Sequence, residues 1–227
     1  MELTPIFLTL LGALLPAFLW LFFFLKEDAH PEPRTRLIKT FLFGALMSVP
    51  ALGLQLFFEN SFGGRVASFM ILTFLFSAIE ESAKFVGAYG AARHSIDFDE
   101  PMDAMIYMLV AGLGFATVEN LFIIGSTMYP LQLGGVFIMG ETLIFRFIGA
   151  TLLHALSSAL VGYYWARGIT IGEEKYFVVI GILVATAAHG IFNSLVYGFQ
   201  TVNLLIPSLF LVGVSFFVFK DFEKIKK

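Results

Sequence analysis

The sequence contains no cysteine and few charged residues. The absence of cysteine excludes disulfides, catalytic thiols and thiolate metal sites. Only 14% of the 227 residues are charged and 58% are hydrophobic, whereas a soluble domain has about 25% charged and about 45–50% apolar residues. The chain also lacks the H-E-x-x-H motif of helical zinc proteases and any basic stripe that would favour nucleic acid. Its composition therefore predicts a membrane protein.

Long apolar runs account for most of the chain. They cover residues 3–25, 37–58, 66–92, 102–124, 135–165, 176–199 and 202–219. Because one span needs about 20 apolar residues, these runs predict an all-α, polytopic membrane protein with about seven transmembrane helices in a single transmembrane domain, residues 1–227. The first run has no basic n-region and no small-residue cleavage site, so we expect a retained helix and not a cleaved signal peptide.

The basic residues are distributed unevenly between the two sides of this arrangement. Arg65 alone lies on one side, and Lys84 and Arg146 lie inside runs. The other side carries eleven: Lys26, Arg34, Arg36, Lys39, Arg93, Arg167, Lys175, Lys220, Lys224, Lys226 and Lys227. Because basic residues collect on the cytoplasmic side of a membrane protein, the N-terminus is predicted outside and the C-terminus in the cytoplasm.

Polar and ionisable residues inside the apolar runs are the main functional signal. A charged side chain at mid-membrane costs about 2.5–3.5 kcal/mol on insertion scales, so it is rarely present without a use. Such residues recur in the third to sixth runs: Glu80, Glu81, Lys84, Glu119, Asn120, His154, His189 and Asn193. Acids and histidines at similar depth are the materials of a catalytic site or a proton pathway.

The adjacent glutamates allow two interpretations. Glu80 and Lys84 lie four residues apart on one helix face, and Glu81 lies about 100° round the helix. One glutamate can therefore pair with the lysine while the other stays available. The structural interpretation is a buried Glu–Lys pair that fixes how the helices pack. The functional one is a general base that activates water.

The later polar residues also have structural alternatives. Glu119 is a lone acid that could form a protonated hydrogen bond between helices. Asn193 follows His189 by four residues, so its amide could stabilise an oxyanion or hold the imidazole tautomer. We interpret Arg146 as structural, paired with Glu119 or Glu141. The remaining histidines, His30 and His94, lie at span ends, where a solvated interfacial role is expected.

A metal site is a second possibility for the same residues. His154 and His189 with one of Glu80, Glu81 or Glu119 could hold zinc, which often has three protein ligands and a water in catalytic sites. No single helix has metal-ligand spacing, since Asn193 and not histidine follows His189 by four residues. The sequence therefore favours a metal-free glutamate mechanism with no cofactor, and zinc is the alternative.

Four motifs in order carry a family resemblance: Glu80-Glu81-x-x-Lys84, Phe115-x-x-x-Glu119-Asn120, His154 and His189-x-x-x-Asn193. Residues 80–194 thus resemble the PrsW family of intramembrane proteases, which is similar to the CAAX prenyl protease and bacteriocin-processing superfamily. That superfamily has a double glutamate followed by arginine, then Phe-x-x-x-His and His-x-x-x-Asn. In this chain Lys84 takes the place of the arginine, at a slightly different offset, and Glu119 takes the place of the histidine. The resemblance implies a multi-pass protein of the prokaryotic plasma membrane that cleaves a membrane-associated peptide.

The sequence therefore predicts an intramembrane endopeptidase within the lipid bilayer that cleaves a membrane-associated protein substrate. Glu80 is expected to activate water with help from Glu81, and His189 and Asn193 to stabilise the oxyanion. Residues Glu119 and His154 are expected to orient water or complete the site. The alternative function is a proton-coupled transporter or a non-catalytic scaffold, although no paired half-repeats typical of transporters are found.

Overall fold

The computed structural model describes residues 3–62, 69–127, 146–198 and 205–226. Their long helices are α1 (Leu3–Phe24), α2 (Arg34–Phe62), α3 (Phe69–Ala92), α4 (Pro101–Thr127), α6 (Leu152–Ile171), α7 (Glu174–Gly198) and α8 (Leu205–Ile225). A short 3-10 turn, Leu25–Glu27, follows α1, and a π-helical segment, Arg146–Thr151, leads into α6. No strand occurs in the described ranges.

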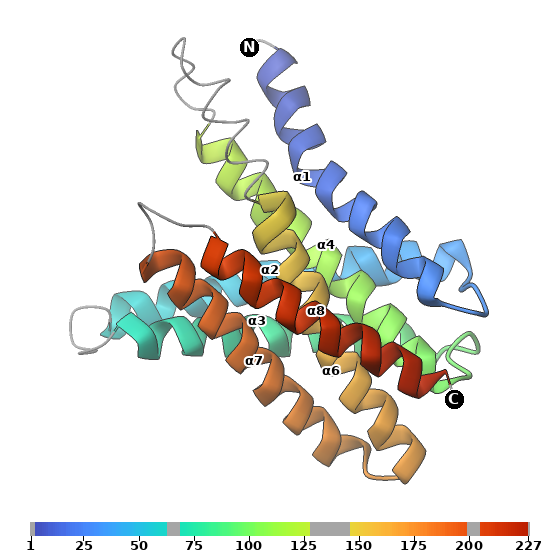
Figure 1. Ribbon diagram of the computed structural model, residues 1–227. Coiled ribbons are helices and arrows are strands. Elements are labelled where there is room, and N and C mark those ends of the chain that lie inside the picture. The colour runs from blue at the N-terminus through green and yellow to red at the C-terminus, as the bar shows by residue number, and fades with distance from the viewer. Residues whose placement is uncertain (1–2, 63–68, 128–145, 199–204, 227) are drawn as a thin grey trace.

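The prediction of an all-helical, polytopic membrane protein is confirmed. Six of the described helices are long and apolar enough to cross a membrane. The remaining long helix, α3, carries three charged residues close together, Glu80, Glu81 and Lys84, yet it runs between the two ends of the bundle like its neighbours (Figure 1). Residues 135–145 of the fifth predicted span, with Glu141, lie outside the described residues, as do residues 199 and 202–204 of the last two.

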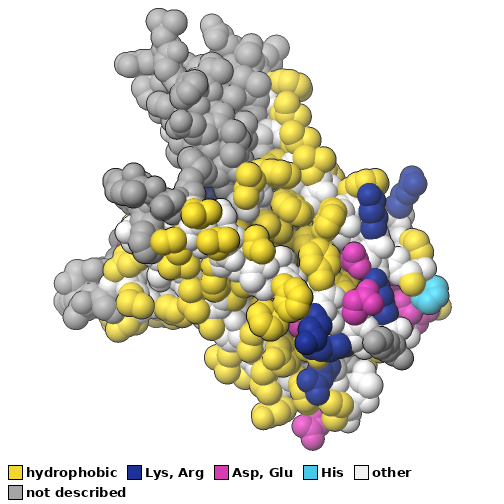
Figure 2. All heavy atoms as spheres, in the orientation of Figure 1, with side chains coloured by type: hydrophobic (Ala, Val, Ile, Leu, Met, Phe, Trp, Pro, Cys, Tyr) yellow, Lys and Arg dark blue, Asp and Glu magenta, His cyan; other side chains and the backbone are white. Residues whose placement is uncertain are grey.

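Helices α4 and α6 form the centre of the bundle. Residues 102–117 of α4 are all buried, and α4 contacts α1, α2, α3 and α6. The outer helices instead expose large apolar side chains such as Phe22, Leu46 and Leu183. Figure 2 shows one such hydrophobic face, on which charged side chains gather toward the end that holds the C-terminus. An apolar exterior of this extent is what a lipid environment requires.

Ion pairs tie the connections together at the charged end. In Figure 1 the α1–α2 and α3–α4 connections lie near the C-terminus there. Arg36 Nε donates to Asp97 at 2.8 Å, and Arg93 donates two hydrogen bonds of 2.9 Å to Glu174. The turn from α6 to α7 uses Gly172 at φ +85°, a conformation that glycine adopts without strain. These contacts fix how α3, α4 and α7 leave the polar end.

Candidate functional site

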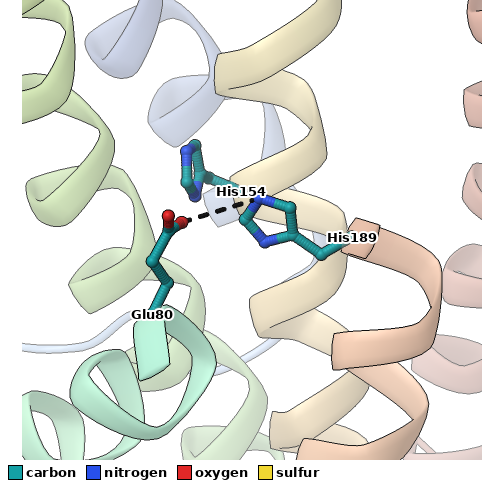
Figure 3. A group of neighbouring side chains, drawn as sticks. All are labelled: Glu80, His154 and His189. Carbon is teal, nitrogen blue, oxygen red and sulfur yellow. Dashed lines mark ion pairs between the residues drawn. The ribbon is translucent and has the colours of Figure 1, made fainter. Parts of the chain in front are cut away.

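Glu80, His154 and His189 come together from three different helices. Figure 3 shows the three side chains converging from α3, α6 and α7. Each residue offers one atom that could bind a metal, and these three atoms lie within 4.8 Å of one another. The residues are only 7%, 2% and 2% exposed, so the group is enclosed by the bundle. Helices far apart in the sequence thus build one polar centre inside an apolar core.

His189 is held in one tautomer by Glu81. Its Nδ1 lies 2.6 Å from Glu81 Oε1. An ionised carboxylate can only accept a hydrogen bond, so Nδ1 carries the proton and Nε2 keeps a lone pair. This Nε2 lies 3.6 Å from Glu80 Oε2. The lone pair of His189 is therefore directed to the middle of the site.

His154 is held in the opposite tautomer by Glu119. Its Nε2 lies 2.8 Å from Glu119 Oε2, so by the same reasoning Nε2 carries the proton and Nδ1 keeps a lone pair. Within the described structure this buried Nδ1 has no hydrogen-bond partner. The two imidazole rings stand perpendicular, with centroids 5.1 Å apart. Each histidine thus contributes one free nitrogen lone pair.

Glu80 is fixed through one carboxylate oxygen and free at the other. Gln55 Nε2 on α2 donates to Glu80 Oε1 at 2.8 Å, whereas the buried Oε2 has no hydrogen-bond partner in the described ranges. Gln55 was not among the residues predicted from the sequence, although it is an amide inside the apolar run 37–58. Buried polar atoms without partners are rare in native proteins and call for an explanation.

The buried lysine pairs with the second glutamate and not with the first. Lys84 Nζ donates to Glu81 Oε1 at 2.7 Å, and both side chains are fully buried. The Phe115 ring lies 5.5 Å from this Nζ. Glu81 Oε1 therefore accepts from both Lys84 and His189. Each glutamate keeps a second, buried oxygen without a hydrogen-bond partner in the described ranges. The two differ in their donors: Glu81 accepts from Lys84 and His189, whereas Glu80 accepts from Gln55.

Glu119 lies beside the three-residue group rather than in it. Besides His154, it accepts a hydrogen bond of 3.1 Å from Arg146 Nη2. Arg146 begins the π-helical segment and also donates to Asn120, which in turn donates to Thr151 at 3.1 Å. π-Helical turns are often found at functional sites. This one places the arginine where it neutralises Glu119, while Glu141, its other expected partner, lies outside the described residues.

The remaining candidates stand apart from the centre. Asn193 lies one turn beyond His189 on α7 and is half-buried, and its side chain forms no hydrogen bond among the described residues. His30 is largely exposed and lies 3.0 Å from Glu100 at the polar end. His94 is exposed beside Tyr89. Glu80, His154 and His189 therefore remain as the group able to act on a common ligand.

The chemistry of this group suits a metal ion. Zinc is commonly held by histidine nitrogens and carboxylate oxygens. Metal-ligating histidines almost always give their other ring N–H to a carboxylate or carbonyl, which fixes the ring. Both histidines here meet that condition. Two buried atoms that could bind a metal, Glu80 Oε2 and His154 Nδ1, have no hydrogen-bond partner among the described residues. The same three atoms could instead surround a water molecule.

Comparison with known proteins adds a family to this geometry. A family model described as PrsW family intramembrane metalloprotease matches residues 32–220. "Protease PrsW" of Geobacillus kaustophilus is 31% identical over 174 residues, covering 76% of this chain and 72% of the relative. The protein of the same name from Oceanobacillus iheyensis is 28% identical over 194 residues and 84% of both chains. That of Bacillus subtilis is 24% identical over 178 residues, covering 76% and 74%. No solved structure gives a significant match.

Proposed function

This chain belongs to the PrsW family of intramembrane proteases, and we propose that Glu80, His154 and His189 form its catalytic centre. The observation that carries the proposal is the convergence of three possible metal-ligand atoms within 4.8 Å. It is supported by Glu80 Oε2 and His154 Nδ1, which are buried without a hydrogen-bond partner in the described ranges. The reaction is hydrolysis of a peptide bond in a membrane-associated protein. The apolar helices and the bacterial relatives support the bacterial plasma membrane as its location.

The three residues would hold a divalent metal ion, with zinc the best match to two histidines and a carboxylate. When bound, such an ion acts as a Lewis acid and makes its water a nucleophile near neutral pH. The metal centre is therefore our preferred hypothesis, in place of the metal-free mechanism that the sequence favoured. The support is that each histidine gives its other ring N–H to a carboxylate, Glu81 or Glu119. A site for water alone does not require this contact.

The surrounding residues keep the centre ready for this chemistry. Glu81 and Glu119 set the tautomers of His189 and His154, so that both lone pairs are directed inward. Gln55 holds one oxygen of Glu80 and leaves the other free. Lys84 and Arg146 balance the charge of Glu81 and Glu119. Phe115, which is 2% exposed, lies beside His154 and limits access of bulk water.

A metal-free route is the second candidate, favoured by the distance of 3.6 Å between Glu80 Oε2 and His189 Nε2. In this route Glu80 takes the proton of a water molecule and returns it to the leaving amine. The oxyanion would need a hydrogen-bond donor, a role that the lone pair of His189 Nε2 does not fill in the tautomer set by Glu81. The transporter and scaffold alternatives gain no support, because the relatives carry the name of a protease.

Metal analysis of the purified protein separates the two routes. We expect stoichiometric zinc in the wild type and in His94→Ala, an exposed histidine control. His154→Ala and His189→Ala should lose most of it while remaining folded in detergent. A wild-type protein that cleaves its substrate without metal, and is indifferent to chelation and zinc add-back, would contradict the metal centre.

Cleavage itself can be followed in cells. Membrane proteins that accumulate uncleaved in a deletion strain identify the substrate, and complementation then tests each variant. Glu80→Gln and His189→Ala should lower cleavage by about 10²–10⁴-fold, the usual contribution of such groups, while His94→Ala restores it. Wild-type cleavage by a folded Glu80→Gln protein would remove Glu80 from the centre.

A further inference from the structure

Trp20 of α1 lies against the π-helical segment that leads into α6. Its indole Nε1 donates a hydrogen bond of 2.9 Å to the backbone oxygen of Phe147. Its ring also stacks on that of Phe147, with centroids 5.4 Å apart and an interplanar angle of 23°. The two residues are 127 positions apart in the sequence, and the family match begins at residue 32, after α1. The contact therefore joins α1 to the part of the chain that carries the family motifs.

The π segment, Arg146–Thr151, depends on contacts from its neighbours. π-Helical turns are rare and occur mostly as single turns within α-helices. A backbone carbonyl has two lone pairs, and the Trp20 N–H occupies one of them at Phe147. A Cβ added at Gly149 would lie 3.3 Å from the Phe192 ring, so the segment is also packed closely on its other side. In the described ranges, Trp20 is the one side chain that donates a hydrogen bond to the backbone of this segment.

The π segment places Arg146 in the hydrogen-bond network behind His154. Arg146 Nη2 donates to Glu119 Oε2 at 3.1 Å, and the same oxygen lies 2.8 Å from His154 Nε2. Arg146 Nε also donates to Asn120, whose amide donates to Thr151 Oγ1 at 3.1 Å. One network thus ties the first and last residues of the segment to α4 and keeps Glu119 beside His154.

The register of the π segment decides where Arg146 stands. Its hydrogen bonds join residues i and i+5 in place of i and i+4, so it holds one residue more than the α-helical turn that would replace it. Conversion to an α-helix would therefore turn Arg146 by about one position, or about 100°, around the helix axis. Such a rotation would separate the guanidinium from Glu119 and loosen the carboxylate that sets the tautomer of His154.

We propose that Trp20 is a positioning residue for His154, an inference that rests on the proposed function. By donating to the Phe147 oxygen and stacking on its ring, Trp20 keeps the segment in its π-helical form. This form holds Arg146 on Glu119, and Glu119 directs the free lone pair of His154 into the centre. Because Trp20 acts through these contacts and not on the reacting atoms, it governs the rate of the chemical step and not the binding of substrate.

Kinetics of two matched tryptophan variants test this role. Trp20→Phe keeps an aromatic ring and loses the N–H donor. Trp165→Phe is the control, because Trp165 is the other of the two tryptophans and donates a comparable hydrogen bond of 2.8 Å to Glu174 at the polar end. The assay uses the full-length protein in detergent and the membrane protein that accumulates uncleaved in the deletion strain.

We expect kcat of Trp20→Phe to fall severalfold with KM unchanged. This loss is smaller than the about 10–100-fold lost when a direct outer contact is removed, because Trp20 lies further from the centre. Trp165→Phe should keep kcat even where its melting temperature falls as far. Unchanged kcat in Trp20→Phe, or losses of kcat in both variants that follow their melting temperatures, would overturn the proposal.

Nuclear magnetic resonance tests the link between Trp20 and Arg146 without requiring turnover. Labelling the indole nitrogens gives one N–H signal for each of the two tryptophans, and Trp165→Phe assigns them. We expect Arg146→Met to move the Trp20 signal and to speed its exchange with solvent. Arg167→Met, at an exposed position of α6, should leave the Trp20 signal unchanged. A Trp20 signal that ignores Arg146→Met, or responds equally to both variants, would overturn the proposal.

Failure of this inference is distinguishable from failure of the proposed function. Cleavage in cells that depends on Glu80 and His189, combined with unchanged kcat in Trp20→Phe, would overturn the role of Trp20 and leave the centre standing. A Trp20 signal that responds to Arg146→Met, combined with undiminished cleavage by folded Glu80→Gln protein, would support the hold of Trp20 on the π segment and overturn the assigned centre.

Discussion

At the residue scale, Gln55 is the contact that decides which oxygen of Glu80 is free. The substitution Gln55→Leu removes the donor to Oε1 and lets the carboxylate rotate. Loss of such an outer contact typically lowers affinity or activity by about 10–100-fold. We therefore expect kcat to fall within that range with little change in KM, measured on the purified protein. Gln55→Glu replaces the donor by a second acid and should be at least as impaired. Unchanged kcat in Gln55→Leu would show that Gln55 does not position Glu80.

Lys84 is the buried cation that compensates Glu81. Removing one member of a buried ion pair leaves an uncompensated charge and costs about 3–5 kcal/mol. We expect Lys84→Met to lose that much free energy of unfolding, and the double variant Lys84→Met with Glu81→Met to recover most of it without recovering activity. Lys224→Met is the control, because its pair with Asp221 is partly exposed and contributes at most about 1 kcal/mol. A double variant no more stable than Lys84→Met would contradict this account.

At the scale of elements, the contact between α2 and α4 depends on glycine at one level and tolerates a side chain at another. Gly44→Ala would drive a methyl group into the backbone of Ala111, and overpacking of this kind costs about 1–3 kcal/mol. Gly53, in the same helix, has no neighbouring heavy atom within 4 Å of an added Cβ. Gly53→Ala should therefore be neutral or slightly stabilising, since alanine favours a helix. If the backbone contact were absent, thermal melts in detergent would show the same change in melting temperature for Gly44→Ala and Gly53→Ala.

The connection between α1 and α2 carries an acid that makes stability depend on pH. Tyr107 of α4 donates a hydrogen bond to Glu32, and burial raises the pKa of Glu32 from 4.5 to about 8. The folded protein thus binds this proton more tightly than the unfolded chain does. The contribution of protonated Glu32 to the free energy of unfolding is complete below about pH 4.5 and is lost as the pH rises toward 8.

We therefore expect the melting temperature to fall as the pH rises across this interval, and Glu32→Gln to reduce the slope. Each 1 kcal/mol corresponds to about 2–4 °C for a domain of this size. Glu59→Gln, an exposed acid at the end of α2, is the control and should keep the slope. A slope in Glu32→Gln equal to that of the wild type would assign the pH dependence to another group.

At the scale of the whole molecule, the charged end of the bundle predicts its orientation. Charged side chains gather near the C-terminus on the face in Figure 2, and the sequence places eleven Lys and Arg residues on that side. The opposing Arg65 lies outside the described residues. Ile96, 91% exposed, lies at the charged end, and the exposed Glu59 lies near the opposite end of α2. Because the chain has no cysteine, single cysteines report position cleanly.

A membrane-impermeant maleimide should label Glu59→Cys in intact cells and Ile96→Cys only after permeabilisation. This result follows from an outside N-terminus, a cytoplasmic C-terminus and the excess of basic residues on the cytoplasmic side. A fully permeable reagent provides the control for reactivity at both positions. The reverse pattern would invert the orientation, and labelling of both positions in intact cells would contradict the number of spans between them.

The sequence by itself determined the helices and most of the polar centre. A bilayer demands long apolar segments with internal hydrogen bonding, so the spans could be located by composition, and an ionisable residue such as Glu80 or His189 stands out against them. The tertiary structure alone decided the partners: Lys84 pairs with Glu81, Glu119 holds His154, and Gln55 holds Glu80. Depth along a span can be read from residue number, but which helices are neighbours, and how each is rotated, depends on side-chain packing between segments distant in the sequence.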